Sequence, residues 1–186
     1  AMAAAAFKMA GGGEVWEKGF TLTVALSPSV AYRRILAEFL KAGLEKVNPK
    51  FKVRIKSMPT DELYLAAEKR TLPLFVTGFN ADYPDNQSMA FGLLHSAGYF
   101  PSAQGYANPA LDRIIEQADA ELDPAKRKAL YLRIGELAGE DLPQVYIYNP
   151  TRFKTMRSWV REDDIEQNVN NLNLNNFPYY YSVSKG

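Results

Sequence analysis

The residue types best suited to chemistry gather in one acidic segment, residues 80–85, which reads Asn-Ala-Asp-Tyr-Pro-Asp. Its two carboxylates, Asp82 and Asp85, can act as a pair in general acid–base catalysis or in holding a metal ion. Residues three apart in a loop that contains proline need not converge, however, and the same residue types form ordinary turns. The segment is therefore a candidate for ligand binding, for carboxylate chemistry or for a solvated turn.

An apolar strand is expected directly before the acidic segment, over Leu74–Thr77. Ligands of open α/β sheets bind outside the carboxyl ends of the strands, where loops and helix termini converge. Gly78 and Phe79 follow the strand, and a glycine before an aromatic residue allows a backbone or a ligand to approach closely. Pro84 fixes its own φ angle and favours an extended backbone before it. The pattern predicts a buried core strand that delivers functional groups at its carboxyl end.

The composition excludes several other chemistries. The chain has 186 residues, 47% hydrophobic and 23% charged, which is enough for one globular domain with a sizeable core. It has no cysteine, which rules out disulfides, thiolate metal sites and cysteine nucleophiles. Its single histidine, His95, has no acidic residue between Asp85 and Asp112 to orient it, so we expect a structural role. A net charge of +1 without a long basic run predicts no nucleic-acid partner.

The sequence pattern of the first half of the chain predicts a parallel sheet. Residues 20–26 and 51–56 alternate apolar with polar or small side chains, as half-buried strands do. We expect an amphipathic helix between them, beginning at residues 27–29 and ending at Asn48-Pro49. Its apolar positions are Ile35, Leu36, Phe39, Leu40, Leu44 and Val47. A short helix capped by Thr60 then leads to the strand before the acidic segment, and two such right-handed crossovers indicate an α/β fold.

The second half predicts a helical hairpin after a less regular region at residues 87–106. Asn108-Pro109 and Asp123-Pro124 are typical starts of two helices, each with apolar residues on one face. Leu122 is counted with the apolar face of the first helix. The charges on the outer faces are interpreted as solvated surface without a function; they are Arg113, Glu116, Lys126 and Arg127. Val145–Tyr148 is expected to be one more strand of the sheet.

The two ends of the chain differ from the middle. Residues 1–19 are interpreted as a helix remnant and a glycine linker, residues 20–158 as the α/β lobe, and residues 159–186 as an Asn- and Tyr-rich tail with irregular structure or an edge strand. The start is too short and too lightly apolar for a membrane span and does not resemble a signal peptide. We therefore expect no membrane insertion and interpret the chain as a piece of a larger protein.

An ordered set of short motifs resembles one known family. The motifs are Lys18–Val24, Asn48–Phe51, Leu72–Phe75, Gly78-Phe79 with Ala81–Asp85, Gly105–Pro109, Asp123–Arg127 and the closing Tyr-rich Ser-Lys segment. Together they resemble the carboxyl-terminal third of family 5 extracytoplasmic solute-binding proteins, the dipeptide and oligopeptide receptors of bacterial ABC importers. The resemblance covers nearly the whole chain, and it rests on the order of the motifs because no single one is specific.

The resemblance implies a periplasmic-binding-protein-like lobe with a mostly parallel mixed sheet flanked by helices, in a parent protein that is periplasmic or extracytoplasmic. Two such lobes close on an extended peptide, and the implied partners are the missing amino-terminal lobe and an ABC importer permease. A family carboxylate that binds the peptide's α-ammonium carries over to Asp82. Phe79 replaces a family tryptophan, and the predicted ligand-binding residues are Gly78, Phe79, Asn80, Asp82 and Tyr83. A second family tryptophan is replaced by the polar run at residues 60–62, and no clear arginine precedes Gly78 to bind a carboxylate.

Three functions remain open from the sequence. The first is a non-catalytic lobe that supplies one wall of a peptide cleft and binds weakly by itself, with no cofactor and no metal. The second is an excised or engineered half-receptor whose apolar surfaces mediate self-association, for example as a homodimer. The third is a hydrolase that uses Asp82 and Asp85, which the absence of histidine clusters and phosphate-binding glycine loops argues against.

Overall fold

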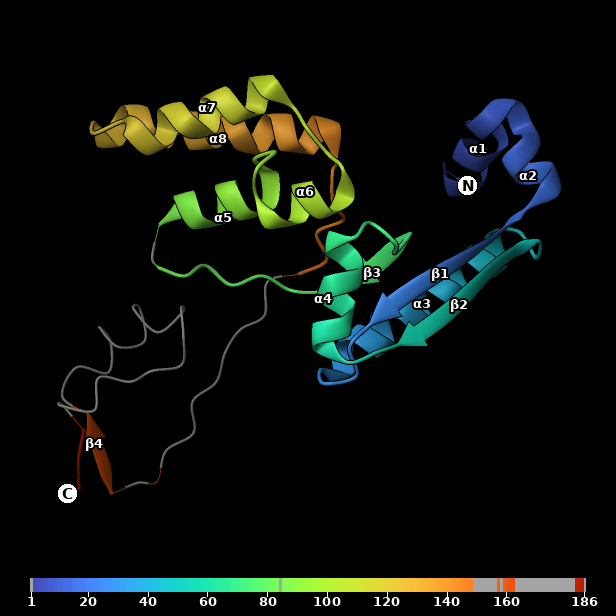
Figure 1. Cartoon of the computed structure of the whole chain (residues 1–186), viewed down its shortest axis with the longest axis horizontal. Helices are drawn as coiled ribbons and strands as arrows, with labels where there is room; N and C mark the ends of the chain where they lie inside the picture. The colour runs from blue at the N-terminus through green and yellow to red at the C-terminus, as the bar shows by residue number, and fades with distance from the viewer. Residues whose placement is uncertain (1, 84, 149–156, 158, 163–182, 186) are drawn as a thin grey trace. The chain divides into compact units, whose positions relative to one another are not determined.

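The computed structural model describes residues 2–83, 85–148, 157, 159–162 and 183–185 (Figure 1). The chain forms two compact units. The first comprises Ala1–Gly78 with Ala103–Gly105, and the second comprises Phe79–Ser102 with Tyr106–Gly186. Every helix within the described residues is too short or too polar to cross a bilayer.

The first unit contains the parallel sheet that the sequence predicts. Its strands are β1 (Phe20–Leu26), β2 (Phe51–Ser57) and β3 (Leu74–Val76), in the order β2-β1-β3. Phe20 lies opposite Phe51, and Val24 lies opposite Leu74, in two parallel ladders. The helices α3 (Ala31–Val47) and α4 (Thr60–Glu68) make the two crossovers, and α3 lies along one face of β1 and β2 (Figure 1). The predicted α/β fold is confirmed.

The core of this unit is centred on β1, because that strand has a neighbour on each side. Val24, Ala25 and Leu26 are fully buried, and Val24 and Leu26 pack with Ala37 of α3 and Val53 of β2. The expectation of a buried core strand at 74–77 is wrong: β3 is a short edge strand whose residues are only half-buried. The central position belongs to the first strand in the chain.

The helix α3 differs from its prediction in two respects. It begins at Ala31, and its N-cap residue Val30 makes no side-chain cap bond, because valine has no polar side-chain atom. The hydroxyl of Ser27, which was expected near the helix start, is hydrogen-bonded to those of Ser29 and Thr60. Two of its predicted core positions, Ile35 and Phe39, are 67% and 80% exposed. The buried face of α3 is therefore narrower than the apolar pattern suggests.

The amino-terminal residues pack on the sheet through aromatic rings. They form α1 (Met2–Met9), the 3-10 helix η1 (Ala10–Gly13) and α2 (Glu14–Lys18), and the three glycines of η1 have positive φ angles of 57°, 63° and 94°. Phe7 lies 4.8 Å from Phe51 between ring centroids, and Trp16 meets Phe51 edge-on at 6.1 Å. The side chain of Asn48 donates to the carbonyl of Trp16 at 2.9 Å. The predicted domain boundaries at residues 20 and 158 stay predictions.

The second unit is built around the predicted helical hairpin. Its helices are α5 (Asn86–Leu94), α7 (Pro109–Ala120), α8 (Pro124–Asp141) and the first four residues of α6 (Tyr99–Gln104), whose last two residues are assigned to the first unit. The side chain of Asn108 accepts from two amides at the start of α7, and that of Asp123 does the same at the start of α8, as the sequence indicates. The buried core consists of Ala90, Leu94, Leu111, Ile115, Ala118, Ile134 and Ala138.

Two expectations for this unit are wrong. Val145–Tyr148 is not a strand: its four side chains are 84%, 56%, 57% and 54% exposed, and no strand of the described residues forms a ladder with the segment. Leu122 is 93% exposed because it lies in the turn between α7 and α8. In the tail, β4 (Val160–Glu162) pairs antiparallel with β5 (Val183–Lys185), and the Asn-rich stretch at 168–176 lies outside the described residues.

Gly19 provides a test of how tightly β1 and β2 are joined. Its φ is 72°, and a Cβ there would lie 2.4 Å from the carbonyl oxygen of Lys50. We expect Gly19→Ala to lower the free energy of unfolding by about 1 to 3 kcal/mol, because it combines backbone strain with a clash against backbone. Chemical denaturation measures this change.

Gly43 is the matched control, because it lies inside α3 with no atom within 4 Å of an added Cβ. Gly43→Ala should raise stability by roughly 0.5 to 1 kcal/mol. Equal effects of the two substitutions would contradict the close approach of the strands at Gly19.

Candidate functional site

Hydrogen bonds join the acidic loop to the start of α5. Asp85 is the N-cap of α5, and its Oδ1 accepts from the amide of Gln87 at 2.7 Å. The amide of Asp82 donates to the hydroxyl of Ser88, in the first turn of the same helix, at 3.1 Å. The bond to Asp85 follows from local sequence, since a carboxylate before a helix satisfies amides that have no intrahelical partner.

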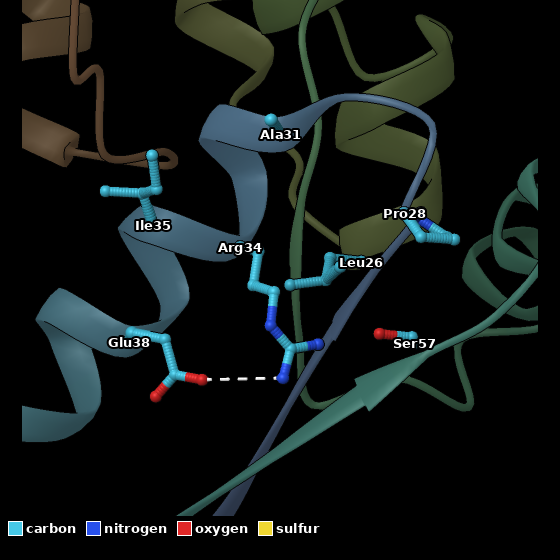
Figure 2. Close-up of a pocket in the computed structure, with 7 residues that line it drawn as sticks. All are labelled: Leu26, Pro28, Ala31, Arg34, Ile35, Glu38 and Ser57. Atoms are coloured by element: carbon cyan, nitrogen blue, oxygen red, sulfur yellow. Dashed lines mark ion pairs between the residues drawn. The ribbon is translucent and has the colours of Figure 1, made fainter.

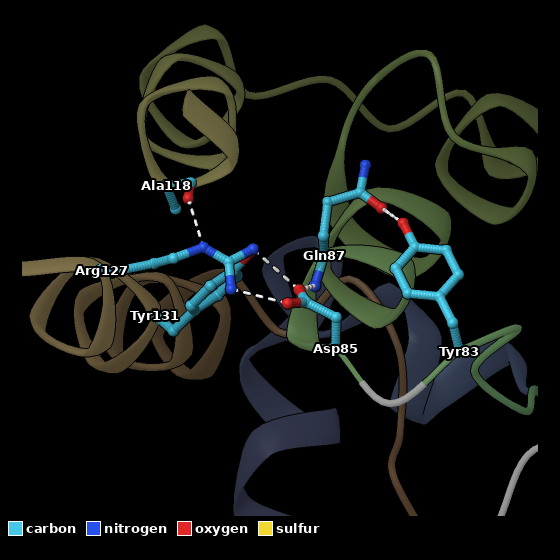
Figure 3. Close-up of polar contacts among 6 residues, drawn as sticks. All are labelled: Tyr83, Asp85, Gln87, Ala118, Arg127 and Tyr131. Carbon is cyan, nitrogen blue, oxygen red and sulfur yellow. Dashed lines mark hydrogen bonds and ion pairs between the residues drawn. The ribbon is translucent and has the colours of Figure 1, made fainter. Parts of the chain in front are cut away.

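A bidentate ion pair joins this loop to α8 (Figure 3). Arg127 donates from Nη1 to Asp85 Oδ2 at 2.7 Å and from Nη2 to Asp85 Oδ1 at 2.8 Å. Its Nε donates to the carbonyl of Ala118 at 2.9 Å, and its guanidinium lies over the ring of Tyr131 at 5.0 Å. The interpretation of Arg127 as solvated surface is therefore wrong: its side chain is only 27% exposed and all three nitrogens of the guanidinium donate.

The ion pair determines the protonation of Asp85. The hydrogen bonds from Arg127 lower the pKa of Asp85 below its usual value, with a smaller contribution in the same direction from the amide of Gln87. Partial burial acts in the opposite direction and does not outweigh them. Asp85 is thus held as a carboxylate whose oxygens are already engaged.

Asp82 is arranged differently from Asp85. Its side chain is exposed, and within the described part of the chain its carboxylate forms no ion pair. Asn80 and Tyr83 are exposed as well, and the Tyr83 hydroxyl donates to the side chain of Gln87. Three of the predicted ligand-binding residues therefore present polar groups on one loop.

The other two predicted residues have structural surroundings. Phe79 is half-buried, and its ring meets that of Phe100 edge-on at 5.8 Å between centroids. The same ring lies 2.8 Å from where a Cβ of Gly92 would stand, so Gly92 makes room for it. Gly78 is exposed at the end of the first unit, and an added Cβ would lie 3.2 Å from the hydroxyl of Tyr32.

His95 has the structural surroundings that the sequence suggests. Its Nδ1 accepts from the amide of Ala97 at 3.1 Å, and its ring stacks on Phe91 at 4.6 Å between centroids. Its Nε2 lies 3.5 Å from Glu116, an acidic residue that follows Asp112 in the sequence. Among the described residues, no three His, Cys, Asp or Glu side chains gather as a metal site would require.

Two hollows occur elsewhere. One of about 450 Å³ lies where β1 and β2 end, and the ion pair between Arg34 and Glu38, at 3.7 Å, borders it (Figure 2). The second, about 420 Å³, lies along α5 and α8 beside Tyr146. The first is lined by Leu26, Pro28, Ala31, Arg34, Ile35, Glu38 and Ser57, so none of the predicted ligand-binding residues contributes to it.

Comparisons with known proteins point to one class. No family model matches the sequence. The chain is 30% identical over 84 residues to the periplasmic oligopeptide-binding protein OppA of Haemophilus influenzae, which covers 45% of this chain and 15% of that protein. OppA of Burkholderia pseudomallei superposes with a TM-score of 0.65 at 23% identity, covering 76% of this chain and 27% of its own. The unliganded open form of the periplasmic murein tripeptide-binding protein MppA gives a TM-score of 0.67 at 19% identity. The match covers 91% of this chain and 31% of the MppA chain.

DppA from Helicobacter pylori, an ABC transporter-associated periplasmic binding protein solved in complex with the peptide STSA, has a TM-score of 0.64 at 21% identity and covers 76% of this chain. These likenesses confirm the predicted resemblance: the fold is that of a lobe of the family 5 solute-binding proteins. The chain spans about 15% of the curated relative's length and less than a third of each of these solved structures.

The separate surroundings of the two carboxylates predict separate effects on stability. Asp82→Asn should change the free energy of unfolding by well under about 1 kcal/mol, because an exposed group without an ion pair is lost. Asp85→Asn keeps an N-cap acceptor but loses the charge that Arg127 binds, so a loss of about 1 to 2 kcal/mol is expected near neutral pH.

The difference in stability between the wild type and Asp85→Asn should shrink as the pH falls. Because the pKa of Asp85 is lowered in the folded chain, its stabilisation is full above the unfolded value of about 3.9 and is lost as the pH falls below that value. Thermal melts of the wild type and Asp85→Asn should therefore converge below about pH 4. A gap that persists unchanged to pH 2 would contradict the ion pair.

Proposed function

We propose that this chain supplies one wall of a peptide-binding cleft in a periplasmic solute-binding receptor, with the carboxylate of Asp82 receiving the peptide's α-ammonium. The proposal rests on the different contacts of the two carboxylates in the acidic loop. Asp85 is bonded to Arg127 and Gln87, whereas Asp82 is exposed and has no ion pair among the described residues. The names of the relatives, oligopeptide- and murein tripeptide-binding proteins, support the same ligand class.

The chemistry of the loop suits an ammonium group. A charge-assisted hydrogen bond from an ammonium to a carboxylate is roughly twice as strong as a neutral one. Asn80 and Tyr83 present further polar groups on the same loop as Asp82, and Phe79 and Gly78 complete the proposed set of ligand-binding residues. The amino-terminal lobe and an ABC importer permease are the proposed partners of the parent protein.

The hydrolase alternative has less support. A general acid or base must exchange a proton near the working pH. The hydrogen bonds from Arg127 lower the pKa of Asp85, and both of its oxygens are occupied. Asp82 is then left without a carboxylate partner, so we propose a binding role without a cofactor and no catalytic activity.

Binding by this chain alone should be weak. A closed cleft excludes water and strengthens each polar contact, whereas one wall leaves the ligand exposed. An exposed ion pair contributes about 0.2 to 1 kcal/mol, and a dissociation constant of 1 mM already requires about 4 kcal/mol. We therefore expect no peptide affinity tighter than roughly millimolar.

Nuclear magnetic resonance at millimolar peptide tests the site directly. Trialanine with a free amino terminus should shift the amide signals of residues 79–83, and N-acetyl-trialanine should shift them far less because its ammonium is absent. Asp82→Asn should remove the difference between the two peptides. Asp61→Asn, which neutralises an exposed carboxylate at the start of α4, is the matched control and should retain it.

Equal shifts with both peptides would contradict the role of Asp82. Calorimetry that gave low-micromolar affinity, abolished by Asp82→Asn, would show instead that one wall suffices.

Self-association is the second candidate function, because Val145–Tyr148 is a run of four exposed apolar and aromatic side chains. An exposed apolar run of this kind can associate with another copy of the chain. Light scattering should give a mass above 20.8 kDa. Combined Val145→Lys and Ile147→Lys should restore the monomer, whereas Leu122→Lys, at an isolated exposed leucine, should not. A monomer in the wild type would contradict this candidate.

A further inference from the structure

The guanidinium of Arg127 occupies a junction between three helices of the second unit (Figure 3). It projects from the first turn of α8, donates to the carbonyl of Ala118 near the end of α7, and binds the N-cap residue of α5. Its Nη2 also donates to the hydroxyl of Tyr131 at 3.1 Å. The guanidinium plane is thereby fixed by partners on each side before it meets Asp85.

Because Asp85 is held by Arg127, the loop that precedes Asp85 is restrained as well. Asp82 lies three residues before Asp85, so its Cα stays within about 11 Å of the anchored residue. Its amide is bonded to Ser88, which is 7% exposed, and the hydroxyl of Tyr83 is bonded to Gln87. The loop is therefore bracketed by contacts to α5, and α5 itself is held at its first turn by Arg127.

The ion pair also sets the charge that the loop presents. Without Arg127, the segment would carry two negative charges that no cation offsets, and these would attract a divalent cation more strongly than a single ammonium. With Arg127 in place, one carboxylate is neutralised and the other remains.

We propose that Arg127 is the positioning residue of this site: it holds Asp85 and so orders the loop from which Asp82 alone faces a monovalent ammonium. The inference rests on the proposed function for its ligand. The ordering of the loop is a property of the chain by itself and is measured without a ligand. Lysine cannot replace this arginine fully, because a single ammonium lacks the planar fork that binds both oxygens of Asp85 and the carbonyl of Ala118 together.

Hydrogen exchange of the Asp82 amide, followed by nuclear magnetic resonance, measures the ordering. Arg127→Gln should speed this exchange at least about tenfold, which corresponds to about 1.4 kcal/mol of lost local stability. Arg127→Lys should give an intermediate rate. Arg133→Gln, which breaks the exposed pair with Glu136 on the same helix, should change it less than about twofold.

Asp85→Asn provides a second route that leaves α7 and α8 intact. It should speed the Asp82 amide as Arg127→Gln does, and the double variant should be no faster than either single one, because both remove the same interaction. An Asp82 amide that stays within about twofold of the wild type in Asp85→Asn would overturn the proposal. So would an equal acceleration throughout α7 and α8 in Arg127→Gln, since that would make Arg127 a general stabiliser of the hairpin.

Addition of Ca²⁺ tests whether Arg127 sets the net charge of the acidic loop. In Arg127→Gln, millimolar Ca²⁺ should shift the amides of residues 82–87, and the wild type should show no such shift; equal responses would overturn the charge selection. If free and acetylated trialanine act alike on the wild type, the proposed function fails, while the exchange rates still decide whether Arg127 orders the loop.

Discussion

The bidentate pair between Asp85 and Arg127 is the interaction on which the second unit depends. Two parallel charge-assisted hydrogen bonds join the N-terminus of α5 to α8, and the same guanidinium satisfies a carbonyl near the end of α7. Removing one partner would leave a partly buried charge without compensation as well as breaking a contact. The pair thus explains at once how the helices meet and why only one carboxylate of the acidic loop stays available.

The predictable features of the chain depend on local sequence. Alternating side chains identify β1 and β2, and the length of the segment between them requires a parallel crossover. Asn108 and Asp123 mark the starts of α7 and α8, because an acceptor before a proline satisfies free amides over one turn. The exposed position of Asp82 also agrees with its expected role, although that role stays a proposal.

The features that the sequence did not reveal depend on distant partners. Arg127 follows Asp85 by 42 residues, and nothing in either segment indicates that they meet. Val145–Tyr148 has the composition of a strand, but no strand of the described residues forms a ladder with it, and Ile35 and Phe39 have the spacing of core residues but are exposed. The ring of Phe79 is half-buried against Phe100 and Gly92, contacts that the sequence did not indicate, and its role in ligand binding stays a proposal.

Titration of the Asp85 carboxyl carbon by nuclear magnetic resonance tests the central claim most directly, because it reports on the interaction with Arg127 itself. The account predicts a pKa below the ordinary value of about 3.9 in the wild type, and a rise toward that value in Arg127→Gln. An ordinary pKa for Asp85 in the wild type, unchanged when Arg127 is replaced, would contradict the division of the two carboxylates into an anchor and a ligand-binding group.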